Sequence, residues 1–243
     1  MKKLSLDRNK IKYLAIAAML CDHIAMFMLS PGISEAPAGR VAVYALMRTI
    51  GRLTAPIMLF FLVEGFVHTS SRKKYGVRLL VFGLISQVPY ALSHYGTLLK
   101  LDLNMIITLF ITFLMLLAEE KIVSLPLRRI TVFALIMSTF CCDWGVIGPF
   151  MAWLFYKFRE DRRSQLRAYS VVCAIQVAAA VIFLAKNGYH WYGELWQAGM
   201  FLAIPVLLCY NGRPGSRSPV NKWVFYVFYP LHLLIFWIIK FRI

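Results

Sequence analysis

Ionisable side chains are scarce in the long apolar stretches of this sequence, and those present recur at short spacings. Asp22 and His23 are adjacent in the first apolar stretch, and Glu64 and His68 lie four residues apart in the second. His232 lies in the last one. A histidine in apolar surroundings can take a proton as a general base or carry an acyl group. These five residues are therefore the candidate catalytic groups.

The spacing of these residues predicts which of them can meet. Glu64 and His68 share one helix face, where they could form an ion pair or a proton relay. Side chains of consecutive helical residues diverge by about 100°, so Asp22 and His23 cannot easily bond to each other. We expect one of them to take part in the reaction while a neighbour such as Arg52 holds the other.

Further polar residues could bind substrate, stabilise an oxyanion or form a structural polar network. They are Arg52, Asn104, Thr108, Asp143 and Tyr229. Asn104 and Thr108 are four residues apart and so share a face. Asp143 precedes a turn, where it could instead cap a helix. An intramembrane histidine or asparagine can also serve only as an interhelical hydrogen bond, so both interpretations stay open.

The composition indicates what must position these groups. The chain has 243 residues, of which 60% are hydrophobic and 16% charged, with a mean hydropathy of +0.67. Such values exclude an ordinary soluble enzyme, a disordered chain and a disulfide scaffold. Nine apolar segments predict an all-α, polytopic integral membrane helix bundle of eight to ten helices. The segments are 12–30, 53–70, 76–94, 102–118, 130–142, 144–158, 168–185, 194–210 and 222–239.

The distribution of charge predicts an orientation. Of the 27 Lys and Arg residues, 20 lie in five predicted cytoplasmic pieces, and this excess predicts an N-in, C-out topology. The pieces are 1–12, 71–78, 119–129, 157–167 and 211–222. Cationic residues split among short loops do not form one nucleic-acid surface, so the net charge of +16 indicates a bilayer partner rather than nucleic acid.

The rest of the chain shows no second module. We expect a single transmembrane domain over residues 1–243, with the first helix uncleaved. The segments 130–142 and 144–158 are short against the roughly 20 residues needed to span a bilayer. Residues 41–52 are amphipathic and are expected at the outer interface, and Trp196 is expected in an outer aromatic belt. The five cysteines show no metal-ligand spacing, and no metal is expected.

The ordered set of short motifs resembles the TraX family along residues 10–240. The N-terminal motifs are Asp22-His23, Gly51-Arg52, Pro56, Glu64-Gly65, His68-Thr69, Tyr75 and Arg78. The later ones are Asn104 with Thr108, Asp143-Trp144-Gly145, Tyr210-Asn211-Gly212 and Phe228-Tyr229-Pro230-Leu231-His232. The family is named for a conjugative-plasmid protein that N-acetylates pilin, and it is similar to the wider group of integral-membrane acyltransferases.

The resemblance implies a bacterial, multi-pass cytoplasmic-membrane acyltransferase with His23 at the position central to transfer. Acetyl-CoA would be the acyl donor. The acceptor, on the extracytoplasmic side, stays open among a pilin-like N-terminus, a glycan and a lipid. CoA carries several phosphates, for which Arg72, Lys74, Arg78 and Arg213 are available in the predicted cytoplasmic loops.

Two other functions remain open at this stage. Intramembrane carboxylates and histidines also suit a proton-coupled transporter or channel. A non-catalytic assembly factor for a surface structure is the second alternative. Replacement of His23 separates the three, because only the acyltransferase should lose acetyl-CoA turnover while remaining folded.

Overall fold

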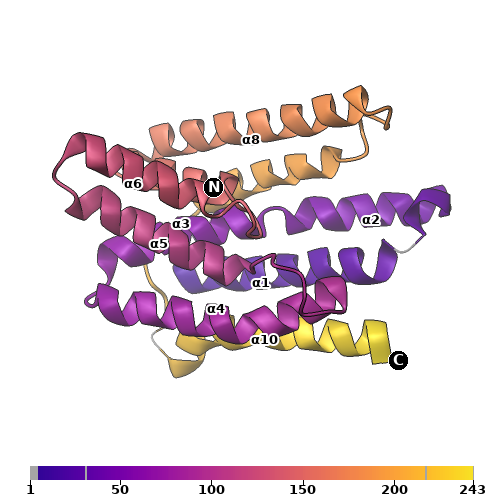
Figure 1. Ribbon diagram of the computed structural model, residues 1–243, viewed down its shortest axis with the longest axis horizontal. Helices are drawn as coiled ribbons and strands as arrows, with labels where there is room; N and C mark the ends of the chain where they lie inside the picture. The colour runs from indigo at the N-terminus through magenta and orange to yellow at the C-terminus, as the bar shows by residue number, and fades with distance from the viewer. Residues whose placement is uncertain (1–4, 31, 217, 243) are drawn as a thin grey trace. The chain divides into compact units, whose positions relative to one another are not determined.

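The computed structural model describes residues 5–30, 32–216 and 218–242 and shows helices joined by short loops (Figure 1). Within these residues β structure is limited to two isolated bridges, Leu6 with Tyr210 and Leu103 with Cys142. The prediction of an all-α fold is confirmed for the described residues. The helices are α1 (Arg8–Ile24), η1 (Ala25–Leu29), η2 (Ile33–Glu35), α2 (Ala38–Gly51), α3 (Thr54–His68), α4 (Arg72–Tyr95), α5 (Met105–Lys121), α6 (Leu125–Met137), α7 (Ile147–Lys157), α8 (Arg162–Lys186), η3 (Leu195–Leu202), α9 (Ala203–Leu208) and α10 (Pro219–Arg242).

The chain divides into two compact units. Unit 1 comprises residues 1–58 and 161–218, and unit 2 comprises residues 59–160 and 219–243. The three boundaries fall inside α3, between α7 and α8, and before α10. Each unit is thus built from two separate parts of the sequence.

In unit 1, α1 packs on α2, and η3 packs on both α2 and α8. Small and apolar side chains form the buried face, with Ile11, Ala15, Tyr169 and Met200 at most 1% exposed. The hydroxyl of Tyr169 donates to the Met200 carbonyl at 2.6 Å, which satisfies a polar group that would otherwise be costly to bury. This bond joins α8 to η3.

In unit 2, α4 packs against both α5 and α10, and α5 packs against α6 and α7 (Figure 1). Aromatic rings fill its interior: Phe60 meets Phe155, and Phe66 meets Phe113, both edge to face. Gly76 and Gly83 let α4 approach α5, because a Cβ at either position would lie within 3 Å of Phe113 or Ile107.

Side-chain caps begin several of these helices. Asp7, Ser71, Asn104 and Asp161 each accept hydrogen bonds from main-chain N–H groups in the first turn of the following helix. Gly96 ends α4 with φ of 68°, a left-handed conformation that glycine adopts without a steric penalty. The turns between apolar helices are therefore encoded locally.

Among the residues that the structure describes, five stretches are long and apolar enough to cross a membrane. They are Arg8–Leu29, Ala38–His68, Arg72–Tyr95, Arg162–Lys186 and Trp223–Phe241. The predicted total of nine spans and the N-in, C-out topology are not confirmed, although each of the nine apolar segments contains a helix. The two predicted short segments correspond to α6, whose 13 residues begin and end five positions before the predicted 130–142, and to α7, whose 11 residues lie within 144–158. Residues 41–51 lie in α2, and Arg52 is its C-cap residue, shortly before α3 begins.

Candidate functional site

A buried ionic cluster in unit 1 joins α1 to the end of α2. The Asp22 carboxylate lies 3.0 Å from Nη1 of Arg48 through Oδ1 and 3.0 Å from Nη2 of Arg52 through Oδ2. The side chains of Asp22 and Arg48 are only 11% and 9% exposed. The expected contact of Arg52 with this residue pair is thus present, and Asp22 is the partner that it holds.

Both arginines also meet the indole of Trp196 from η3. The guanidinium carbons of Arg48 and Arg52 lie 4.3 and 4.8 Å from the Trp196 ring centroid. Each arrangement is a cation–π contact, which gains strength when the cation is desolvated. One carboxylate faces two guanidinium groups, so the cluster carries a net charge of +1, part of which the aromatic face stabilises.

Two glycines allow the backbones around this cluster to approach closely. A Cβ at Gly51 would lie 2.2 Å from the Asp22 Cβ, and a Cβ at Gly199 would lie 1.9 Å from the Thr49 carbonyl oxygen. Real Cβ atoms do not tolerate such distances. Glycine at these two positions therefore sets the spacing at which Asp22, the arginines and Trp196 meet.

His23 occupies the same turn of α1 as Asp22 but a different face, as the 100° rotation between neighbours requires. Its ring lies 5.6 Å from that of Phe27. The α-helix changes directly afterwards into a π-helix over Ala25–Leu29. Such widened turns occur frequently at functional sites, and this one begins two residues after His23.

A second polar cluster lies in unit 2 around the start of α5. Asn104 donates from Nδ2 to the Gly83 carbonyl and to Gln87 Oε1, both at 2.8 Å. Its Oδ1 accepts from the N–H groups of Ile106 and Ile107. An amide has two donors and two acceptor positions. All four are used here, so the geometry favours a structural role for Asn104 over an oxyanion donor.

Asp143, in the loop before α7, is held through its main chain. The Asp143 N–H donates to the Leu103 carbonyl at 2.8 Å, and the Asp143 carbonyl accepts from Oγ1 of Thr108 at 2.6 Å. Thr108 and Asp143, two of the predicted polar residues, are thus brought together. Asp143 does not cap α7, whose N-cap is Val146.

This loop contains strained backbone. Trp144 and Val146 have φ of 56° and 60°, values that are uncommon for residues with a side chain and rare for a β-branched one. The N–H of Ile147 donates to the Gly145 carbonyl at 2.6 Å, which closes a three-residue γ-turn on Val146. Thr139 Oγ1 accepts from the Val146 N–H at 2.8 Å. Strain of this kind clusters at functional sites.

His232 and Tyr229 lie on α10, on either side of Pro230. The Nδ1 of His232 lies 2.8 Å from the Phe228 carbonyl, and its ring stacks on Phe228 at 4.7 Å. The Tyr229 hydroxyl accepts from the Met105 N–H at 3.3 Å. A hydroxyl that accepts one bond keeps its own proton for donation.

The predicted Glu64–His68 pair takes a different form. The Nδ1 of His68 lies 2.9 Å from the main-chain carbonyl of Glu64, four residues earlier in α3, rather than bonding to the carboxylate through that atom. His68 is exposed and Glu64 is half-buried. Both residues lie in α3 with the predicted spacing of four, but Nδ1 of His68 bonds to the main chain at the end of the helix and not to the Glu64 side chain.

The four cations predicted to bind CoA phosphates have different surroundings. Arg72 pairs with Glu120 at 2.5 Å and lies over the Phe66 ring. Arg78 lies over the Tyr75 ring, and Lys74 is exposed. Arg213 belongs to unit 1, whereas the other three belong to unit 2. The pair with Glu120 leaves Arg72 less available for a phosphate than Lys74.

Sequence reasoning missed three residues that complete these clusters: Arg48, Trp196 and Gln87. Arg48 lies four residues before Arg52, a spacing that could have indicated a shared face. Trp196 was expected in an aromatic belt, but its ring covers the two arginines. Gln87 bonds to both the N–H and the side chain of Asn104. Nothing in its local sequence distinguishes it.

Together, the long apolar helices and the buried ionic groups define an all-helical membrane protein with ionisable residues in its packed interior. The family model described as TraX protein matches residues 7–240, nearly the whole chain. The chain therefore belongs to the TraX family.

The chain is also similar over most of its length to a curated protein. The "Probable fimbrial assembly protein FimC, serogroup H1" of Dichelobacter nodosus is 32% identical over 234 residues, which cover 92% of this chain and 91% of that protein. No solved structure matches the chain. The family and this relative both fit a role connected with pili.

Proposed function

We propose that this protein is a bacterial cytoplasmic-membrane acetyltransferase that moves an acetyl group from acetyl-CoA to an acceptor on the far side. The observation that carries the proposal is the fixed Asp22 beside His23 on an apolar helix. Membership of the TraX family supports the reaction type. Ionisable groups in membrane helices are costly and mark functional sites.

The chemistry assigns the proton-transfer role to His23. An acceptor amine or hydroxyl attacks the thioester carbonyl, a C–N or C–O bond forms, and the C–S bond to CoA breaks. His23 takes the acceptor proton as general base and returns it to the departing thiolate, which leaves as CoA thiol. In the variant with a covalent intermediate, the imidazole carries the acetyl group between the two steps.

The ionic cluster would act through position and charge. Asp22 is held from both oxygens, so the first helix is anchored to α2 directly beside His23. Arg48 and Arg52 leave a net positive charge on the cluster. The same positive charge would stabilise an oxyanion on the thioester carbonyl. Arg48 and Trp196 are thus positioning residues in this proposal.

The acceptor is proposed to be a component of a pilus or related surface structure. The relative's printed name concerns fimbrial assembly, and the family fits a pilus-related role. A protein N-terminus supplies the amine that N-acetylation needs. On the cytoplasmic side, the exposed Lys74, with Arg78 of the same unit, would meet the phosphates of CoA.

A non-catalytic assembly factor is the second candidate, and the name of the relative favours it equally. In that case the Asp22 cluster would only hold α1, α2 and η3 together. His23 would then be replaceable without loss of pilus formation.

The decisive experiment is an acetyl-transfer assay on the purified full chain in detergent. Wild type, His23→Ala and His190→Ala are incubated with radiolabelled acetyl-CoA, and both released CoA and protein-bound label are measured. His190 lies in an exposed loop of unit 1 and serves as the matched histidine control. The proposal expects turnover in wild type and His190→Ala and a loss of at least about 100-fold in His23→Ala. No CoA release by any of the three proteins would favour the assembly factor, and equal release by all three would overturn the role of His23.

A further inference from the structure

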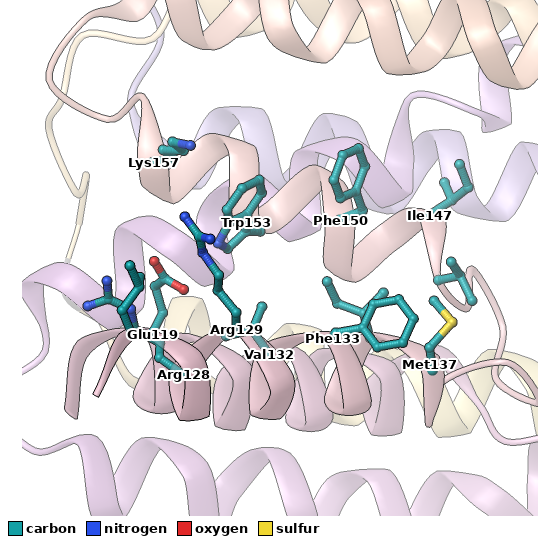
Figure 2. A pocket seen from close by; sticks show the side chains of 13 residues that line it. Glu119, Arg128, Arg129, Val132, Phe133, Met137, Ile147, Phe150, Trp153 and Lys157 are labelled. Atoms are coloured by element: carbon teal, nitrogen blue, oxygen red, sulfur yellow. The ribbon is translucent and has the colours of Figure 1, made fainter. Parts of the chain in front are cut away.

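A cavity of about 660 Å³ lies between α6 and α7 in unit 2 (Figure 2). Its volume is in the range of about 300–1,000 Å³ found for small-molecule sites. Helix α6, which forms one wall of the cavity, is strongly exposed: the side chains of its Ile130 and Phe133 are 66% and 64% exposed. In a membrane protein, apolar side chains with this exposure face lipid, so the cavity opens towards the bilayer.

The two ends of the cavity differ in chemistry. Figure 2 shows Arg129, Glu119 and Lys157 together at one end, and Phe133 and Met137 at the other. The basic residues lie at the start of α6 and the end of α7. Because both helices place their cationic ends together, the cavity has a charged mouth and an apolar interior.

The charged mouth has excess positive charge. Arg128, Arg129 and Lys157 face a single carboxylate, that of Glu119. Within the residues that the structure describes, none of these three cations forms an ion pair. Unneutralised basic pockets of this kind on the cytoplasmic side bind anionic lipid headgroups. Arg128, Arg129 and Lys157 also fall in the predicted cytoplasmic pieces 119–129 and 157–167.

Trp153 supplies an independent indication of a ligand. Its ring lies 4.8 Å from the Lys157 ammonium. Its indole Nε1 is buried and has no hydrogen-bond partner in the part of the chain that the structure describes. A buried donor without a partner is costly, and it calls for an explanation. An ester or phosphate oxygen at the mouth of the cavity would accept from it.

We propose that this cavity binds one anionic phospholipid of the cytoplasmic leaflet. The phosphate lies among Arg128, Arg129 and Lys157, and an acyl chain runs between Phe133 and Phe150. The apolar wall distinguishes this occupant from CoA, because the pantetheine arm has amides that need polar partners. An acyl chain is in apolar surroundings both in the bilayer and in the cavity, so its transfer between them contributes little to selectivity. The headgroup therefore sets the selectivity.

The test is native mass spectrometry of the full chain in detergent with phosphatidylglycerol or phosphatidylcholine of equal chain length. We expect phosphatidylglycerol to be retained about tenfold better. In R128Q/R129Q/K157Q this preference is lost. The control K73Q/R163Q/R167Q removes the same charges from exposed positions outside the cavity and keeps the preference.

Three results would overturn the proposal. One is equal retention of both lipids by wild type, and another is an unchanged preference in R128Q/R129Q/K157Q. The third is displacement of phosphatidylglycerol by acetyl-CoA, which would assign the cavity to CoA instead. If the triple variant does not fold, R129Q alone is used, with R163Q as its control, and a smaller loss of preference is expected. Lipid retention is read without acetyl transfer, so its outcome is independent of the proposed enzymatic activity.

Discussion

Gly51 of α2 lies directly against Asp22 of α1, with no room for a side chain between them. A Cβ at position 51 would lie 2.2 Å from the Cβ of Asp22 and 2.3 Å from its Oδ1. The ion pairs of Asp22 with Arg48 and Arg52 depend on this approach, because Arg48 precedes Gly51 in α2 and Arg52 follows it as the C-cap residue.

Gly51→Ala is therefore expected to destabilise the protein by about 1–3 kcal/mol, the usual range for overpacking. The first helix must move away from α2, and the Asp22 ion pairs lengthen. Thermal unfolding in detergent, followed by tryptophan fluorescence, measures the effect. Gly39→Ala is the control in the same helix, because nothing lies within 4 Å of its Cβ position. A Tm for Gly51→Ala equal to that of the control would contradict the close packing.

The second prediction concerns the order of two substitutions in the ionic cluster. Asp22→Asn removes the carboxylate that pairs with both guanidinium groups, of which that of Arg48 is buried, and is expected to cost about 3–5 kcal/mol. Arg48→Gln removes one of the two ion pairs and leaves the Asp22–Arg52 pair intact, so it is expected to cost less. The free energy of unfolding, measured for both variants under the same conditions, shows which of them loses more stability. A larger loss in Arg48→Gln would mean that the carboxylate is not the centre of the cluster.

The helices and part of this cluster could be predicted from sequence because the bilayer limits the possibilities. Apolar segments in lipid must satisfy their own backbone, and a helix does so locally. Arg52 was expected to hold one residue of the Asp22–His23 pair, and the Asp22 carboxylate, which needs a cation in an apolar helix, is the one that it holds. The positions of Arg48 and Trp196 depend instead on the approach of three helices at Gly51 and Gly199. Such tertiary distances leave no local pattern.

The sequence pattern also did not predict where the helices deviate locally from α-helical hydrogen bonding. The segment 194–210 was expected as one span, but it is a 3-10 helix over Leu195–Leu202 followed by α9. The contact of Gly199 with the Thr49 backbone accompanies this change. The π-helix over Ala25–Leu29 has the same apolar composition as the α-helix before it. Hydropathy therefore placed both segments but did not predict their hydrogen bonding.

The third prediction tests the strained turn before α7. Val146 has φ of 60° and ψ of −57°, which a β-branched residue adopts at a cost and glycine adopts freely. Val146→Gly is expected to leave stability unchanged or to raise it by about 1 kcal/mol. Val77→Gly, at an exposed position within α4, is expected to lose about 1 kcal/mol. Equal losses in the two variants, measured by thermal unfolding, would show that Val146 is not strained.

The fourth prediction is a pH dependence at the start of α8. The pKa of the Asp161 carboxyl is lowered from its ordinary value of 3.8 by hydrogen bonds from the Ser164 hydroxyl and from the Arg163 and Ser164 N–H groups. A lowered pKa means that the ionised cap stabilises the folded state above about pH 4, and that this contribution is lost as the pH falls through the lowered pKa. The Tm difference between wild type and Asp161→Asn should therefore shrink in acid. A difference that stays constant between about pH 7 and pH 2 would contradict the cap.

The last prediction separates a structural from a chemical role for Asn104. Its amide donors bond to Gly83 and Gln87, and its oxygen caps α5. Asn104→Asp keeps the cap but removes both donors and places a carboxylate oxygen against two acceptors. It is therefore expected to lower stability at least as much as Asn104→Ala, which costs about 1–2 kcal/mol from the lost cap alone. Thr112→Ser, which retains the hydroxyl of a neighbouring buried residue, serves as the control. Loss of acetyl-CoA turnover by Asn104→Ala at unchanged Tm would instead make this amide an oxyanion donor.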